Sequence, residues 1–471
     1  VDIFFVISGY LITSIILKEL VSTGSFSFQY FYERRIRRIL PVLLVVMFVS
    51  SIFACIFLLP EILIDFTKSI IYSLGFSSNF YFHYSDQNYF FQGIRKPFLH
   101  SWSLAVEEQY YILFPIVFFT IFKYFRKYLI YILVIGAIVS LILAEWGSRN
   151  HPSFNFYILP TRGWELLAGS LMAYFEITRG ERSKNKFLQI IFPSIGLFLI
   201  CFSIVFFNEK IRHPSFYTLI PITGTCLIIW YSNRNEIVTK MLSTKLFVGI
   251  GLISYSLYLW HYPILSFNEI INFFEDDILK NIILLFIIII LSIFSYFFLE
   301  KKFRDKNFNL KKIFSIIIFS YIILILLSIN VITKEGFKDK YNSIYKKNNF
   351  FNYELSMKTH QILKDNYHEQ KFESDKFKIL IIGDSHSIDL FFAFITNQDL
   401  FNEYEFQRYG YNGNDDSINF NKHTTIKAFQ KFEDSELFKK ADIFLVSDFI
   451  NKDEDLQKLE QFIFYFKEKK K

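Results

Sequence analysis

Residues 312–333 read KIFSIIIFSYIILILLSINVIT, a run in which Lys312 is the single charged side chain. A helix needs roughly 20 apolar residues to cross the hydrocarbon core of a bilayer, and it satisfies its own backbone hydrogen bonds there. This run therefore predicts a transmembrane helix. The other apolar segments of the chain can be compared with it.

Nine other segments match this run in length and composition. They begin near residues 1, 39, 108, 129, 161, 187, 216, 246 and 281. A further segment, at about residues 64 to 82, is weaker because it contains Asp65 and Lys68 and ends in serine and asparagine. We expect that segment to lie at the interface or to re-enter the membrane. The sequence thus predicts a polytopic α-helical membrane protein with ten spans.

The charges in the loops predict how the spans are oriented. Alternate loops are rich in Lys and Arg, namely residues 33–38, 123–127, 178–186, 232–245 and 300–312. Cytoplasmic loops carry such an excess, so these loops are expected on the cytoplasmic side. Counting residues 64 to 82 as a span would move residues 123–127 outside. The span at 312–333 then exits outward, which predicts an extracytoplasmic location from about residue 334 onward.

The composition agrees with a membrane region followed by a soluble region. The chain is 52% hydrophobic and contains 61 Phe, more apolar surface than a water-soluble domain can bury. From Lys334 to Lys471, by contrast, it holds 22 Lys and Arg plus 24 Asp and Glu. The net charge of +7 arises in loops beside the spans, so it indicates membrane topology and no nucleic-acid partner. No metal site is predicted, because the cysteines lie in apolar runs without metal-ligand spacing: Cys55, Cys201 and Cys226.

Charged residues in or beside membrane spans are costly and are therefore candidates for function. The predicted cytoplasmic end of the second span reads YFYERRIRR, residues 30–38, and contains Arg34, Arg37 and Arg38. Guanidinium groups bind phosphates well, so this cluster could bind a phosphorylated acyl donor such as a coenzyme A thioester. An ordinary positive-inside anchor explains the same cluster equally well.

Four other ionisable residues are predicted towards the outer side of the membrane: Glu107, Arg162, Glu165 and His261. Arg162 and Glu165 are three residues apart, so they share a helix face and can pair. At 1.5 Å per residue, His261 lies roughly 22 Å from the cytoplasmic end of its helix, where a histidine can shuttle protons or accept an acyl group. The structural alternatives are an aromatic belt around Glu107, a simple ion pair and a hydrogen-bonded core histidine.

The soluble region contains KILIIGDSHS, residues 378–387. This pattern predicts a buried strand, a tight turn at Gly383 and a helix that begins near Ile388. Such a turn places the Ser385 hydroxyl at a helix amino terminus, where backbone amides can stabilise an oxyanion. A helix-capping role is the alternative, and we favour a nucleophile. Its base is missing from the pattern, because the histidines that follow have no clear acid partner: His386 and His423.

Six blocks of the membrane region, together with this motif, identify a family. The blocks are FFVISGYLI (4–12), FYERRIRRILP (31–41), HSWSLAVEEQYY (100–111), PTRGWELLAG (160–169), ISYSLYLWHYP (253–263) and SYFFLEKKFR (295–304). In this order they resemble the acyltransferase-3 family of membrane acyltransferases, and GDSHS at 383–387 resembles the first block of a fused SGNH-hydrolase-like domain. Enzymes of this type O-acetylate bacterial surface polysaccharides.

The resemblance implies roles for the matching residues. The donor would be acetyl-CoA, with no bound cofactor, and its site would include Arg34, Arg37 and Arg38. Glu107 and His261 would be catalytic. The acyl path or its support would comprise Arg162, Glu165, Tyr255 and Tyr258. Ser385, in a block with Gly383, Asp384 and His386, would take the acetyl group or deliver it to a sugar hydroxyl.

The resemblance also implies that the chain is a fragment. A further span carrying an Arg and a His is expected before Val1, and the carboxyl-terminal Asp-x-x-His of an SGNH domain has no match, so the chain alone is expected to be inactive. The predicted domains are a membrane domain (1–305), a linking transmembrane helix (306–335), a linker (336–375) and a partial α/β SGNH-like domain (376–471).

The expected function is O-acyl transfer at the bacterial inner membrane. An acetyl group would pass from cytoplasmic acyl-CoA to a hydroxyl of an extracytoplasmic polysaccharide such as O-antigen, peptidoglycan or exopolysaccharide. Two alternatives stay open: an acceptor that is a lipid or a small secreted molecule, and a transporter with an accessory domain. The transporter is less favoured because we find no internal repeat and it gives the Gly-Asp-Ser motif no role.

Overall fold

The computed structural model describes residues 1–85, 96–180, 185–208, 211–233, 236–271, 278–305, 308–339, 371–383, 385–396, 398–410 and 432–446. Its contacts divide the chain into two units, Val1–Lys338 and Asp339–Lys471. Each unit is described by itself.

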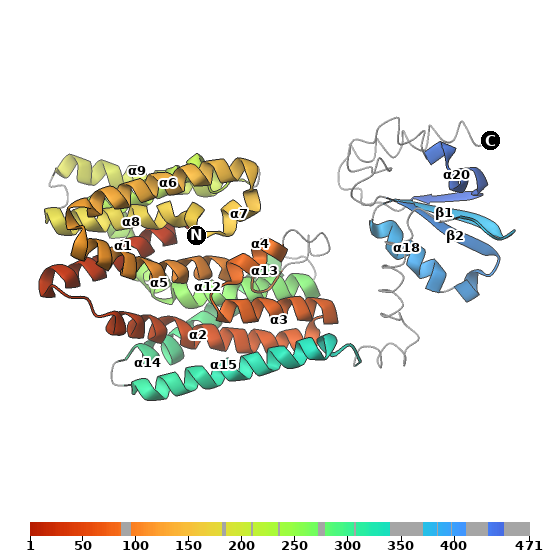
Figure 1. Ribbon diagram of the computed structural model, residues 1–471, viewed down its shortest axis with the longest axis horizontal. Helices are drawn as coiled ribbons and strands as arrows, with labels where there is room; N and C mark the ends of the chain where they lie inside the picture. Colours follow the sequence, from red (N-terminus) through yellow and green to blue (C-terminus); the bar gives the residue numbers. More distant parts are fainter. Residues whose placement is uncertain are drawn as a thin grey trace. The chain divides into compact units, whose positions relative to one another are not determined.

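The first unit is built from helices that pack side by side (Figure 1). A helix is present at each of the ten predicted segments: α1 (Asp2–Thr23), α2 (Phe28–Phe57), α5 (Ser101–Tyr124), α6 (Leu129–Asn150), α8 (Leu159–Arg179), α9 (Lys186–Phe206), α10 (Leu219–Tyr231), α12 (Lys245–Ile271), α13 (Ile278–Ser295) and α15 (Leu310–Thr333). Between them lie α3 (Pro60–Leu74), α4 (Ser78–Ser85), α7 (Pro152–Tyr157), α11 (Ile237–Leu242) and α14 (Lys301–Arg304).

Seven of the described helices are long and apolar enough to cross a membrane: Asp2–Thr23, Phe28–Phe57, Ser101–Tyr124, Arg126–Asn150, Lys186–Phe206, Leu279–Arg304 and Leu310–Thr333. The protein is therefore a multi-pass membrane protein. The helices at the other three predicted segments, α8, α10 and α12, are not among the seven. α10 is short, and α8 and α12 carry polar side chains along their length. The count of ten spans thus stays a prediction.

The weak segment at residues 64–82 does not form one continuous helix. It is divided between α3 and α4, with a turn at residues 75–77. α3 packs against α2, α5 and α15. Asp65 is buried there, and its carboxylate accepts a hydrogen bond from the Tyr81 hydroxyl of α4. Neither helix belongs to the seven that can cross a membrane.

α1 and α8 approach each other unusually closely. A methyl group added at Gly9 would lie 1.8 Å from the carbonyl oxygen of Leu166, and one added at Gly169 would lie 1.9 Å from the carbonyl oxygen of Val6. Small residues permit such backbone contact between membrane helices, whose association depends on packing. This crossing fixes the amino-terminal helix against the helix that carries Arg162.

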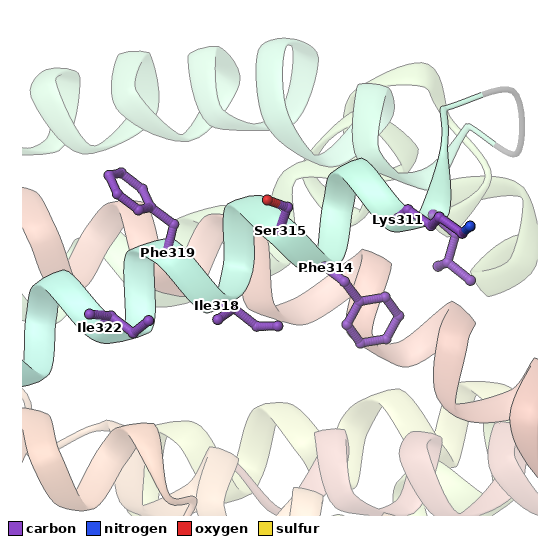
Figure 2. A pocket seen from close by; sticks show the side chains of 7 residues that line it. Lys311, Phe314, Ser315, Ile318, Phe319 and Ile322 are labelled. Atoms are coloured by element: carbon purple, nitrogen blue, oxygen red, sulfur yellow. The ribbon is translucent and has the colours of Figure 1, made fainter.

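The outside of the first unit is apolar, as lipid contact requires. On α15 the side chains of Phe314, Ile318 and Ile322 are exposed and line a groove of about 590 Å³, with Lys311 near one end (Figure 2). None of the predicted site residues lines this groove. The polar residues described below lie on the other helices.

The second unit contains a three-stranded parallel sheet in the order β2-β1-β3, formed by β1 (Phe377–Gly383), β2 (Tyr404–Gly410) and β3 (Ile443–Val446). Leu380 and Ile382 pack in one apolar cluster with residues of α20 (Glu436–Lys440), whereas Ile379 and Ile381 pack in another with residues of α18 (Ser385–Thr396). Both faces of β1 are thus buried, which explains its continuous apolar sequence. The predicted strand is confirmed, and the helix after it begins at Ser385, earlier than expected.

Candidate functional site

Glu107 links α1 to α5 in the interior of the first unit. Its carboxylate accepts hydrogen bonds from the hydroxyls of Ser8 on α1 and Tyr111 on α5. The Tyr111 hydroxyl also lies 2.8 Å from Ser8 Oγ. The guanidinium of Arg35, from α2, lies over the Tyr111 ring at 4.5 Å. Glu107 is therefore held in a network drawn from three helices, of which the sequence analysis named only Glu107 itself.

Glu108, the next residue on the same helix, has a buried carboxylate. It is 8% exposed, and its Oε1 atom has no hydrogen-bond partner among the described residues. Arg35 and Arg38 are close enough to interact with it electrostatically. A buried polar atom without a partner is costly. Glu108 is therefore a candidate for binding a ligand or for accepting a proton.

The arginines of α2 differ in their surroundings. Arg37 is buried, pairs with Glu33 at 2.8 Å, and donates hydrogen bonds to the carbonyl oxygens of Phe303, Asp305 and Phe308 at 3.4, 3.3 and 3.1 Å. These bonds fasten α2 to the chain between α14 and α15.

Arg34, by contrast, lies over the ring of Tyr30 at 4.6 Å. Neither Arg34 nor Arg38 forms an ion pair within the described ranges. These two guanidiniums are therefore better placed than Arg37 to meet a phosphate.

A short π-helix, Tyr296–Glu300, interrupts the helical run between α13 and α14. It places Glu300, which is 2% exposed, where its carboxylate accepts a hydrogen bond from Ser256 Oγ of α12 at 2.5 Å. One turn away on each helix, Trp260 Nε1 donates to Ser295 Oγ at 2.9 Å. π-helical turns occur frequently at functional sites. Glu300 is a site candidate that the sequence analysis missed, although the block containing it was recognised.

Arg162 is the centre of a buried charged cluster. Its Nη1 atom lies 3.0 Å from Glu165 Oε1, as the three-residue spacing predicted, and 3.1 Å from Asp2 Oδ1. His213 Nε2 lies 3.2 Å from the same Asp2 oxygen. Arg162 and Glu165 are 1% and 0% exposed, and the guanidinium also lies over the Trp102 ring at 5.3 Å. The cluster ties α1, α8 and the loop before α10 together.

His261 lies among aromatic rings where α12 meets the start of α5. Its Nδ1 atom is 3.2 Å from the carbonyl oxygen of Leu257. The ring centroids of Tyr258 and His100 are 5.8 and 5.7 Å from that of His261. The Tyr258 hydroxyl lies 2.9 Å from Ser103 Oγ. The structure therefore brings His261 and Tyr258 to the amino-terminal end of α5.

These residues are arranged in order along α5 and α12. His100 directly precedes α5, and Ser103, Glu107 and Tyr111 follow it on that helix, over about 17 Å at 1.5 Å per residue. α12 contacts this series at Ser103 through Tyr258, whereas its Tyr255 hydroxyl donates to the carbonyl oxygen of Ile39, next to Arg38, at 2.9 Å. A series of polar groups thus extends between the arginines of α2 and the two histidines.

In the second unit, the predicted serine site lies at the carboxyl end of the central strand. Gly383 ends β1 and Ser385 begins α18. Asp384 and His423 lie outside the described residues, as do the side chains of Ser385 and His386. Since β2 and β3 flank β1 on opposite sides, the strand order switches at β1, and ligands of open parallel sheets bind at such a point. Close by, Arg408 Nε of β2 donates to the buried Ser387 Oγ at 2.6 Å.

Buried ionisable groups on the helices of a multi-pass protein define a membrane-embedded enzyme or a transporter. Comparison with known proteins separates these classes. Residues 1–301 match the acyltransferase domain family. The chain belongs to this acyltransferase family.

The relatives specify the reaction. A Staphylococcus aureus (strain COL) protein named as a presumed O-acetyltransferase is 31% identical over 425 residues, which cover 83% of this chain and 69% of that protein. The corresponding protein of strain MRSA252 is 32% identical over the same length. O-acetyltransferase OatA of strain NCTC 8325 is 31% identical over 322 residues, 66% of this chain and 53% of OatA. No solved structure matches. The protein is thus an enzyme of the O-acetyltransferase type.

Proposed function

We propose that this enzyme transfers acetyl groups from acetyl-CoA in the cytoplasm to hydroxyl groups of a polysaccharide outside a bacterial inner membrane. The observation that carries the proposal is the series of polar groups between the arginines of α2 and the two histidines, His100 before α5 and His261 on α12. It offers an anion-binding end and a proton-accepting end, with the part-buried Glu107 and the buried Glu108 between them.

The arginine end suits the acyl donor. Coenzyme A carries phosphates, which planar guanidiniums bind through paired hydrogen bonds. Arg34 and Arg38 are the candidates for this contact, while Arg37 holds the local fold through its bonds to carbonyl oxygens. The basic loops of the sequence support a cytoplasmic location for this end.

The opposite end suits transfer to an alcohol. The acceptor hydroxyl attacks the acyl carbonyl, a base removes its proton, and the group ends as an ester. His261 is the candidate base. Glu107 positions Ser8 and Tyr111 beside the path, and the Arg162 cluster holds α1 and α8 in register around it. Tyr255 and Tyr258 support α12 against α2 and α5.

The second unit would act last, on the extracytoplasmic side. Ser385 at the carboxyl end of β1 would take the acetyl group or deliver it to the sugar. The switch in strand order at β1 and the anchoring of Ser387 by Arg408 support a ligand site here. A lipid or a small secreted molecule is the alternative acceptor, and the second unit argues for the polysaccharide.

Mass spectrometry of surface polysaccharide tests the proposal. Cells would carry the full-length enzyme as wild type, His261→Ala or Ser385→Ala. Loss of ester-linked acetyl in both variants supports a relay from the membrane domain to the second unit. Loss in His261→Ala alone removes Ser385 from the path. Polysaccharide acetylation that is the same with and without the wild-type enzyme excludes the polysaccharide as acceptor.

A further inference from the structure

His100 is a buried histidine that lies among aromatic rings. It is 6% exposed, and neither Nδ1 nor Nε2 has a hydrogen-bond partner among the described residues. Four rings surround it, with centroids at 5.5 Å for Phe98, 5.1 Å for Tyr258, 5.7 Å for His261 and 5.4 Å for Tyr262. A phenylalanine would suit these surroundings better than a histidine does.

Such an arrangement destabilises the folded protein. A buried donor or acceptor without a partner is costly, and native proteins pair nearly all such groups. A side chain that is unfavourable for folding and held in a fixed place points to a ligand that supplies the missing hydrogen bond. Any such ligand must present a polar atom at the His100 ring.

The backbone around His100 is firmly held. The Tyr258 hydroxyl of α12 donates to the His100 carbonyl oxygen and lies 2.9 Å from Ser103 Oγ, one turn further along α5. These contacts fix the backbone at His100 relative to α12, which carries His261. The two imidazoles lie next to each other where α12 meets the start of α5, with ring centroids 5.7 Å apart.

His261 complements His100 chemically. Its Nδ1 lies 3.2 Å from the Leu257 carbonyl oxygen, which selects the tautomer with the proton on Nδ1 and leaves a lone pair on Nε2. One ring can then accept a proton while the other donates a hydrogen bond. This pair of roles is what attack of an alcohol on an acyl carbonyl needs.

We propose that His100 is a catalytic residue of acetyl transfer, a role that rests on the proposed function. Its ring N–H donates to the carbonyl oxygen of the acyl thioester or acyl-enzyme ester and stabilises the oxyanion. The acceptor oxygen forms the new bond to the carbonyl carbon, and its proton passes to His261 Nε2. The bond from that carbon to the leaving sulfur or oxygen then breaks, and the leaving atom takes the proton from His261.

The test compares His100→Phe and His100→Gln in the full-length enzyme in membrane vesicles, with His83→Phe as the matched control. His83 is a part-buried histidine of α4 whose Nδ1 lies 3.0 Å from Ser153 Oγ, so it has the partner that His100 lacks. Two readouts are needed: the melting temperature, and the release of free coenzyme A from acetyl-CoA, which reports transfer to any acceptor.

We expect His100→Phe to melt at or above the wild-type temperature while its kcat falls by about 10²- to 10³-fold, the usual effect of removing one oxyanion donor. His100→Gln should recover part of that loss, and His83→Phe should melt earlier with unchanged kcat. A His100→Phe enzyme that melts earlier and keeps its kcat overturns the proposal.

The proposed function can fail separately. If coenzyme A is released but no polysaccharide is acetylated, the polysaccharide is excluded as the acceptor. The kcat values of the His100 variants can still be compared with that of the wild type. If the wild type releases no coenzyme A, the melting temperature decides alone, and a lower value for His100→Phe overturns the inference.

Discussion

Replacement of Gly9 by alanine tests the crossing of α1 and α8. The new methyl carbon would lie 1.8 Å from the Leu166 carbonyl oxygen, whereas a carbon normally approaches a carbonyl oxygen no closer than about 3.3 Å. The helices must therefore separate by about 1.5 Å or distort. Overpacking of this kind costs about 1–3 kcal/mol, so we expect the free energy of unfolding to fall by that amount.

Gly251→Ala is the matched control. Gly251 is also in a helix, α12, but nothing lies within 4 Å of the position a methyl group would take. Alanine there should stabilise the helix by about 0.5–1 kcal/mol. Helix propensity favours alanine over glycine at both sites. The difference in stability between the two variants therefore measures the effect of the methyl group at the crossing of α1 and α8.

Titration of the detergent-solubilised enzyme with a denaturing detergent, followed by tryptophan fluorescence, gives both free energies. The double variant Gly9→Ala and Gly169→Ala should lose less than the sum of the single losses, because one separation of the helices makes room for both methyl groups. Acetyl transfer should also fall in Gly9→Ala, since Ser8 moves away from Glu107. Equal stability of the Gly9→Ala and Gly251→Ala enzymes would refute the close crossing.

Three further predictions concern charged residues. Arg162→Met should destabilise the enzyme by about 3–5 kcal/mol because it leaves Glu165 buried without its partner. The double variant Arg162→Met and Glu165→Leu should recover part of this loss in the same titration. A double variant that is no more stable than Arg162→Met would contradict the pairing. Arg37→Gln should lower stability with little change in the KM for acetyl-CoA, whereas Arg34→Gln should raise that KM; the reverse pattern would make Arg37 the donor ligand.

The third prediction concerns Glu405 of β2. Burial raises the pKa of its carboxyl group, but hydrogen bonds from Ser374 and the Glu373 amide outweigh burial and lower that pKa below its usual value. A lowered folded-state pKa means stabilisation that is present above the unfolded pKa of about 4.3 and lost as the pH falls through the folded value. Hydrogen exchange at the Ser374 amide should therefore show an acid-dependent loss of protection that is absent from Glu405→Gln.

Local patterns predicted the elements well. Apolar runs predicted a helix at each expected segment. An apolar strand followed by a glycine and a serine predicted β1 and α18. The pair of Arg162 and Glu165 followed from a three-residue spacing on one helix. In each case the signal lies within a few residues of sequence, where backbone geometry alone decides the outcome.

Contacts between distant helices were not predictable in this way. Ser8 and Glu107 are 99 positions apart, and Asp2 reaches Arg162 across 160. A helical pattern reports which face is apolar but not which helix will cover it. His100 belongs to a recognised block, yet only the structure shows that its ring nitrogens have no hydrogen-bond partner among the described residues.

The π-helix before α14 sets how far that part of the chain can be shortened. A π-turn corresponds to one residue more than the α-helix needs, and each residue of an α-helix turns the next by about 100°. Deleting a single residue between Tyr296 and Leu299 would therefore restore regular α-helical bonding and keep the helices on either side in register, whereas deleting two would turn Glu300 by about 100° relative to Ser256. Descendants of this gene can therefore lose one residue from the segment and keep the contact of Glu300 with Ser256, but they cannot lose two.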